Sequence, residues 1–200
     1  MGGVGATDRR ALSEVVAEAR ACTICADSLP HGPRPVLQVA SGARIVLIGQ
    51  APGRRVHESG IPWDDPSGER LRAWLDVDAA TFYDPARIAL IPMGFCFPGT
   101  GRSGDLPPRP ECAPTWHPRL LEQLPEDRLT VLLGAYAQAR YLPARSGTLT
   151  ETVRRWREHL PTVVLPHPSP RNQRWLRTNP WFEDEVVPEL RRLVAHHLRG

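Results

Sequence analysis

Four cysteines are spaced in two pairs that suit a metal centre. Cys22 and Cys25 form a CxxC pair, and Cys96 and Cys112 lie sixteen residues apart. Four thiolates are the usual ligands of an iron–sulfur cluster or of tetrahedral zinc. A thioredoxin-type redox pair is disfavoured, because such a CxxC opens a helix after a strand, whereas this one follows a predicted helix. The remaining alternative is four unrelated buried thiols.

A glycine-rich loop, GQAPG at residues 49–53, directly follows a short apolar run. Its glycines permit positive φ and close backbone approach, so main-chain N–H groups can face a ligand there. The GxGxxG spacing of dinucleotide-binding loops is absent, and a plain strand-to-loop turn is an equal alternative. Ten residues after Gly53 comes Trp63, which either stacks on a flat ligand or packs in the core.

A histidine between two prolines follows the last predicted strand, in the segment HPSPRN at residues 167–172. The flanking prolines restrict the backbone around His167 and hold it rigidly. Rigid placement is what an electrostatic catalyst requires. A structural histidine is the alternative interpretation.

The elements that carry these segments predict an α/β fold. Short apolar runs at residues 44–49, 87–92, 129–133 and 162–165 are typical of buried parallel strands. Helices are predicted at residues 8–21, 67–75, 118–124, 135–142, 150–159 and 180–198. The alternation indicates one domain over residues 1–200, a four-stranded parallel sheet flanked by helices in a three-layer sandwich. In such folds ligands bind at the carboxyl ends of the strands, which is where the three loops above lie.

The composition says more about the cellular compartment of the protein than about its binding partner. The net charge is only +3, and all 25 basic residues are arginine. Arginine suits phosphate contacts, but a GC-rich genome produces the same bias, so charge alone does not establish a nucleic-acid partner. No apolar run approaches the ~20 residues of a membrane span, and the first residues lack the apolar core of a signal peptide. We therefore expect a cytoplasmic protein, without a membrane partner, whose thiols are reduced.

Taken together, GQAPG, SGIPW, SGERLRAWL and HPSPRN resemble, in their order and spacing, the motifs of the uracil-DNA glycosylase superfamily. They are most similar to the family 4 enzymes, over roughly residues 22–172. The resemblance implies a monomeric hydrolase that excises uracil from single- or double-stranded DNA in base-excision repair. It also implies that the four cysteines hold a [4Fe–4S] cluster, with structural zinc as the alternative.

The resemblance further implies roles for individual residues. His167 would stabilise the negative charge on the departing base, Trp63 would stack on uracil, and Arg171 would fill the gap that a flipped base leaves. The candidate catalytic residues are His167, Gln50, Asp64 and Asp65; the base-binding residues are Gly49, Gln50, Ala51, Trp63, Met93 and Gly94; the DNA-binding residues are Ser67, Ser169, Arg171, Asn172 and Arg174; the metal ligands are Cys22, Cys25, Cys96 and Cys112.

Two departures from the family patterns affect the expected chemistry. Family 4 has an acid in GEAPG where this chain has Gln50, and family 1 has an acid in GQDPY where this chain has Ala51. We expect Asp64 or Asp65 to supply the missing carboxylate, unless both merely cap the following helix. The asparagine expected before the third cysteine is also missing. The alternatives are therefore a glycosylase for hypoxanthine or xanthine, and a protein that binds uracil or abasic DNA without turnover.

Overall fold

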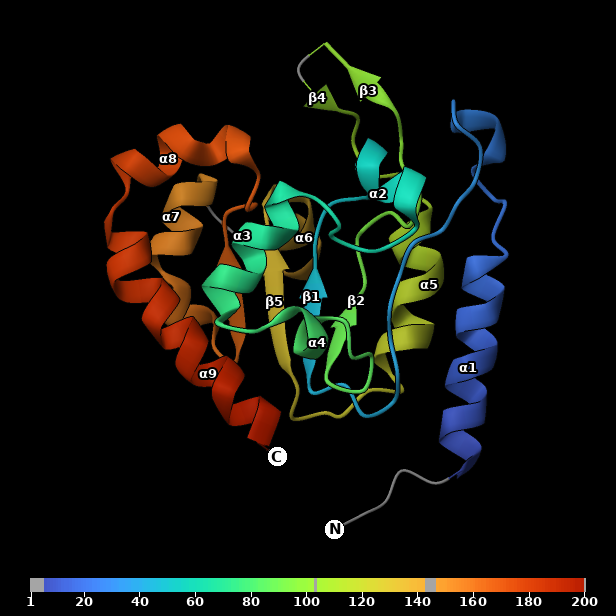
Figure 1. Cartoon of the computed structure of the whole chain (residues 1–200), viewed down its shortest axis with the longest axis horizontal. Coiled ribbons are helices and arrows are strands. Elements are labelled where there is room, and N and C mark those ends of the chain that lie inside the picture. The colour runs from blue at the N-terminus through green and yellow to red at the C-terminus, as the bar shows by residue number, and fades with distance from the viewer. Residues whose placement is uncertain (1–5, 103, 143–146, 200) are drawn as a thin grey trace.

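Four parallel strands form the centre of the protein, in the order β2–β1–β5–β6 (Figure 1). The computed structural model describes residues 6–102, 104–142 and 147–199. The strands are β1 (Ile45–Ile48), β2 (Ile88–Leu90), β5 (Leu129–Leu133) and β6 (Thr162–Leu165). In the register of the sheet, Ile45 is paired with Ile88 on one side and with Leu129 on the other. This is the predicted fold class.

Helices cover both faces of this sheet. Figure 1 shows α3, α4 and α9 in front of it and α6 and α7 behind it, with α1 beside α5 at one edge. The α-helices are α1 (Ala6–Arg20), α2 (Arg54–Ser59), α3 (Pro66–Leu75), α4 (Ala79–Phe82), α5 (Cys112–Leu121), α6 (Ala135–Tyr141), α7 (Leu149–Arg154), α8 (Gln173–Thr178) and α9 (Val187–Arg199). No described helix is both long and apolar enough to cross a membrane.

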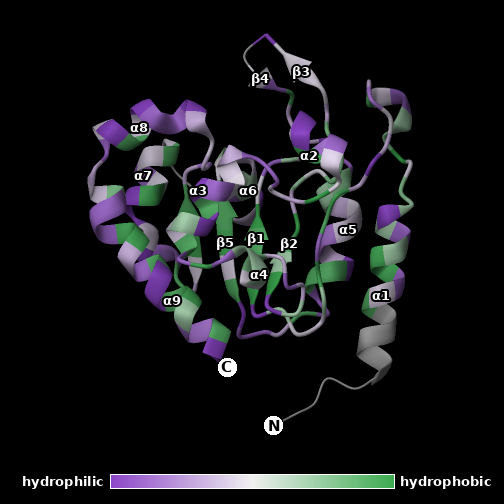
Figure 2. Cartoon of the chain, viewed as in Figure 1, coloured by the Kyte–Doolittle hydropathy of each residue, from purple (hydrophilic) through white to green (hydrophobic). Residues whose placement is uncertain are grey.

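The core is made by the continuous apolar strands and by one face of each long helix. On α9, Val187, Leu190 and Val194 recur at helical spacing and are buried. Figure 2 shows the same division, with apolar strands inside and polar helix faces outside. Burying each such side chain contributes about 1.5–3 kcal/mol, so the sheet is a rigid base for the loops at its ends.

The predicted strands agree with the observed ones to within two residues, but one predicted helix is wrong at its start. Helix α5 begins at Cys112 instead of near Pro118. Pro114 lies in the first turn of α5, where its missing N–H has no intrahelical acceptor to lose, so proline does not stop the helix there. The predicted helix 150–159 is α7 followed by a 3₁₀ turn, and the closing helix consists of a π turn (Phe182–Val186) and then α9.

One small element of the Pro-rich loop was not predicted. Strands β3 (Thr100–Gly101) and β4 (Gly104–Asp105) form an antiparallel hairpin that projects beyond the carboxyl ends of the central strands (Figure 1). Its strands are two residues long and carry no alternating apolar pattern, so periodicity does not reveal them.

Candidate active site

A cavity of about 490 Å³ opens at the carboxyl edge of the sheet. The strand order reverses there, because the chain leaves β1 for β2 on one side and returns to β5 on the other. Such a switch point separates the loops and leaves a crevice for a ligand. The lining residues are Val36, Gln50, Ala51, Pro52, Gly53, Val56, Pro62, Trp63, Asp65, Ser67, Pro92, Gly104, Asp105, Tyr136, His167, Ser169, Arg171 and Asn172.

Most of the site residues expected from the sequence line this one cavity. They are Gln50, Ala51, Trp63, Asp65, Ser67, His167, Ser169, Arg171 and Asn172. Others support it from outside: the N–H groups of Met93 and Gly94 donate to the carbonyls of Gly49 and Gln50, at 2.9 and 3.0 Å. Two lie elsewhere. Asp64 lines a separate surface groove beside α1, and Arg174 is exposed on α8.

Trp63 is held in the cavity wall by close packing on glycines. A Cβ at Gly49 would lie 2.7 Å from the indole Cζ2, and a Cβ at Gly68 would collide with the Trp63 carbonyl oxygen. The backbone of Trp63 has φ of 58°, a conformation that costs a non-glycine residue about 1–3 kcal/mol and that concentrates at functional sites. Its ring stacks on His167, with 5.5 Å between centroids and 28° between planes. The glycines of both motifs are therefore needed to seat this ring.

His167 is a neutral hydrogen-bond donor in this cavity. Burial lowers its pKa to about 4, so the ring is uncharged at neutral pH. The Ser169 N–H donates to Nδ1 at 3.2 Å, which leaves the proton on Nε2. The Asn172 amide donates to the His167 carbonyl at 2.7 Å and fixes the backbone. Among the described residues, no protein group is recorded as a hydrogen-bond partner of Nε2, so this N–H is available to a ligand.

Asp65 is the N-cap of α3. Its Oδ1 accepts a hydrogen bond from the Gly68 N–H at 2.8 Å, and its φ and ψ are extended, as a cap requires. One oxygen of this carboxylate is therefore occupied although the residue lines the cavity.

This geometry predicts how two substitutions at the cap differ. We expect Asp65→Ala to lower the free energy of unfolding by about 1 kcal/mol, and Asp65→Asn to change it by much less, because asparagine caps as well as aspartate. Urea unfolding of both variants measures the difference. Equal destabilisation would contradict the capping role, and a large loss of turnover in a fully stable Asp65→Asn variant would assign the carboxylate to chemistry.

Three polar or charged residues at the site were not singled out from the sequence. Arg70 on α3 donates from Nη1 to the carbonyls of Pro168 and Ser169, at 3.3 and 3.1 Å, and so ties α3 to the loop after β6. Tyr136 and Asp105 line the cavity from α6 and from the hairpin. Arg70 looks like an ordinary charge on a helix face, and its partners lie almost one hundred residues away, so no local signal marks it.

A buried histidine supports the loop after β2. The Nε2–H of His117 donates to the carbonyl of Pro92 at 2.9 Å, and the Tyr141 hydroxyl donates to Nδ1. Burial lowers the pKa of His117 to about 4. The neutral His117 ring thus accepts a hydrogen bond from the Tyr141 hydroxyl at Nδ1 and donates one to the Pro92 carbonyl from Nε2. The second bond fixes Pro92 at the cavity.

The depressed pKa values of His117 and His167 predict a loss of stability in acid. An unfolded histidine titrates near pH 6.5, whereas His117 and His167 titrate near 4 when folded. Between these values the unfolded chain binds more protons, so stability falls as the pH falls from 6.5. We expect the Tm to drop by roughly 5–10 °C between pH 7 and pH 5, by scanning calorimetry. The exposed His196 provides the control, since His196→Ala should leave the slope unchanged; a Tm independent of pH over this range would contradict the prediction.

A model of the uracil DNA glycosylase superfamily matches residues 38–191 of this 200-residue chain. The chain belongs to the uracil DNA glycosylase superfamily. The match contains all four central strands and every residue of the cavity except Val36. Membership indicates a DNA glycosylase activity, which is a hydrolysis that acts on DNA.

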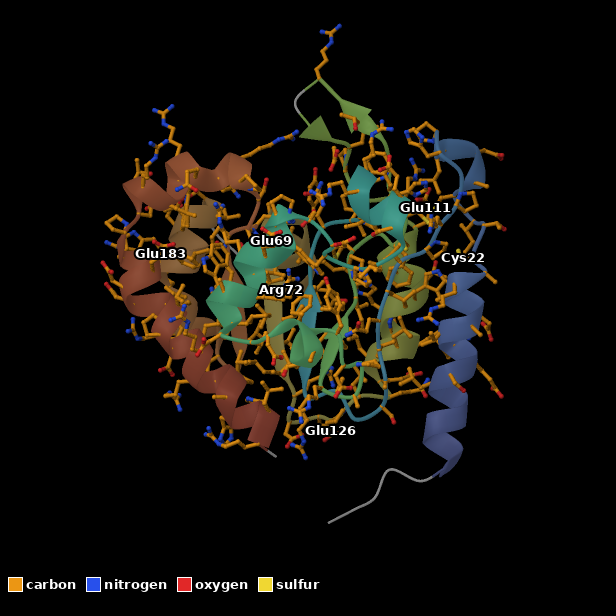
Figure 3. All side chains as sticks on the ribbon, viewed as in Figure 1. Cys22, Glu69, Arg72, Glu111, Glu126 and Glu183 are labelled. Carbon is orange, nitrogen blue, oxygen red and sulfur yellow. The ribbon has the colours of Figure 1, made fainter. Side chains whose placement is uncertain are left out.

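The four cysteines of this superfamily member face a second, smaller cavity, which shares no lining residue with the first. Figure 3 labels Cys22 just after α1 and Glu111 just before α5, the two segments that meet at this cavity. None of these four cysteines forms a disulfide. Burial raises the pKa of Cys96 to about 11 and that of Cys112 to about 12. Four thiols that line one cavity, with the Arg109 guanidinium beside Cys25, are a donor set that fits a metal centre.

Proposed function

We propose that the protein excises uracil from DNA by hydrolysing the N-glycosidic bond and leaving an abasic site. The observation that carries the proposal is the meeting of GQAPG, Trp63 and a neutral His167 in one cavity of a superfamily member. A base in a duplex must leave the stack to reach such a cavity, and a flat aromatic wall suits a flat base.

The state of His167 fits the charge that develops in this reaction. Bond cleavage moves negative charge onto the departing pyrimidine, whose carbonyl oxygen then becomes a stronger acceptor. A neutral imidazole that donates from Nε2 can stabilise that oxygen, and it does so most effectively where burial excludes water. Because the Ser169 N–H occupies Nδ1, the ring needs no reorganisation to present its proton.

The loop after β6 and the start of α3 are suited to hold the DNA strand. Arg171 and Asn172 follow His167 directly, and Arg171 lies against Gly104 of the hairpin at the rim of the cavity. We infer that Arg171 fills the gap of a flipped base, that Ser169 and Arg174 contact the backbone, and that Ser67 meets a phosphate at the N-terminal turn of α3. We further infer that the enzyme works as a monomer.

We infer a family 4 relationship and a [4Fe–4S] cluster bound by Cys22, Cys25, Cys96 and Cys112. The four thiols line one cavity, and four thiolates are the usual ligands of either such a cluster or zinc. The preference for the cluster over zinc rests on the resemblance to family 4. When bound, the cluster would link the segment after α1 to α5 and act in folding.

Two alternatives rest on particular residues. Met93 and Gly94 stand in the segment where many relatives carry an asparagine that reads the uracil edge, which favours hypoxanthine or xanthine as the base. The lack of an acid in GQAPG favours a binder without turnover.

One assay tests the proposal and both alternatives. The purified protein is incubated with single- and double-stranded oligonucleotides that contain one uracil, hypoxanthine or xanthine, and abasic sites are cleaved by alkali. We expect strand breaks with uracil. Strand breaks only with hypoxanthine or xanthine would show that the substrate is a purine base and not uracil. A gel shift without strand breaks would show that the protein binds DNA without turnover.

A further inference from the structure

The cavity contains an acidic residue that lies far from GQAPG in sequence. Among the described lining residues, only Asp65 and Asp105 are acidic. Asp65 gives one oxygen to the cap of α3. Asp105, in strand β4, is exposed and caps no helix.

The hairpin brings Asp105 directly against GQAPG. Its Oδ2 lies 3.3 Å from the position that a Cβ at Gly53 would take, so the last glycine of the motif leaves room for this carboxylate. The Gln50 amide donates to the carbonyl of Leu106, the next residue, at 3.4 Å. The hairpin thus contacts GQAPG at two points, and one of them is the glutamine that replaces the expected acid.

The hairpin is also fixed on its other side. The Thr100 hydroxyl donates to Asp105 Oδ1 at 3.4 Å, and the Leu106 N–H donates to the carbonyl of Gly99 at 2.8 Å. Gly104 packs so closely on Arg171 that a Cβ there would collide with the guanidinium. The hairpin therefore contacts the loop that carries His167, and Asp105 and His167 lie in the walls of the same cavity.

We propose that Asp105 is a catalytic residue that replaces the acid missing from GQAPG; this rests on the proposed glycosylase function. Its carboxylate orients a water molecule toward C1′ of the flipped nucleotide and stabilises the positive charge of the sugar. As the bond between C1′ and the base nitrogen breaks, its electron pair goes to the base, whose oxygen accepts from His167. The water oxygen bonds to C1′, and its proton passes to Asp105 and then to solvent.

Bound DNA makes this role stronger than the exposed position of Asp105 suggests. The hairpin projects beyond the carboxyl ends of the central strands (Figure 1), and Gly104 and Asp105 line the cavity. A nucleotide that enters the cavity would therefore cover the carboxylate and displace water. The attraction between opposite charges a few Å apart rises several-fold when water is excluded.

Single-turnover excision from a single-stranded uracil oligonucleotide tests the proposal. We expect Asp105→Asn to lower the rate by at least about 10²-fold, the scale of losing one charge-stabilising group. Binding to an oligonucleotide with a tetrahydrofuran abasic analogue, and the Tm, should stay unchanged, because Asp105 is exposed on a short hairpin. Asp127→Asn is the control for loss of a surface carboxylate away from the cavity. Asp127 follows Glu126 at the opposite end of the molecule (Figure 3), where it forms an exposed ion pair with Arg44.

Chemical rescue separates catalysis from placement of the hairpin. Formate should raise the excision rate of the Asp105→Ala variant at least about tenfold, because a small carboxylate can enter the space left by the side chain. A wild-type rate in Asp105→Asn would overturn the role of Asp105 while leaving the proposed function intact, and so would a slow Asp105→Ala variant that formate does not rescue. A wild-type protein that excises no base would overturn both.

Discussion

Replacing His167 by alanine is expected to lower the excision rate by at least about 10²-fold. The change removes the Nε2–H donor and its stack on Trp63, but it leaves the backbone held by the prolines and by the Asn172 amide. DNA affinity should change little, because the imidazole acts on the departing base and not on the phosphates. Single-turnover rates and gel-shift affinities for the wild type and for His167→Ala give the comparison. The control is His196→Ala, which removes an exposed imidazole from α9.

The pH dependence of the same reaction distinguishes a neutral donor from a cation. Because burial lowers the pKa of His167 to about 4, the ring keeps the same uncharged form from pH 8 down to about pH 5. The contribution of His167 should therefore be constant over this range, and the ratio of wild-type to His167→Ala rates should not vary. A ratio that falls as the pH rises through 6.5 would show that an imidazolium is the active form.

Replacing Cys112 by serine is expected to have the largest effect on stability. Cys112 opens α5 and is the most strongly desolvated of the four thiols, and the Phe95 N–H donates to its sulfur at 3.3 Å. Structural metal sites contribute on the order of 10 kcal/mol to folding, comparable with the whole stability of a typical domain. With the proposed cluster as the structural metal site, we therefore expect Cys112→Ser to bind no metal and to be largely unfolded.

Absorbance and metal analysis measure this loss. Anaerobically purified wild type should be brown with broad absorbance near 400 nm, roughly as iron–sulfur thiolates absorb, and Cys112→Ser should lack that colour. Thr23→Ala, an exposed change inside the CxxC pair, is the matched control and should keep both colour and fold. A colourless wild type with stoichiometric zinc would overturn the iron assignment, and a stable Cys112→Ser variant from a metal-free wild type would overturn the site.

The sequence was sufficient where a property depends on neighbouring residues. Strands β5 and β6 were predicted at their observed bounds, because a strand buried on both faces is a continuous apolar run that short-range periodicity detects. The same reasoning placed His167 and GQAPG at strand ends, and hence at one edge of a parallel sheet. The start of α5 was the weak point: the prediction began near Pro118, whereas the helix begins at Cys112, with Pro114 in its first turn and Pro118 in its interior.

The tertiary structure decided which distant residues meet. Arg70 reaches the loop after β6, the hairpin brings Asp105 to GQAPG, and Asp64 turns away from the cavity that Asp65 lines. The two cysteine pairs are visible in the sequence, but only packing of the segment after α1 against α5 brings all four thiols to one cavity. Such contacts join residues some fifty to one hundred positions apart. They depend on the order of strands in the sheet and on how loops pack, which burial periodicity within a single segment does not encode.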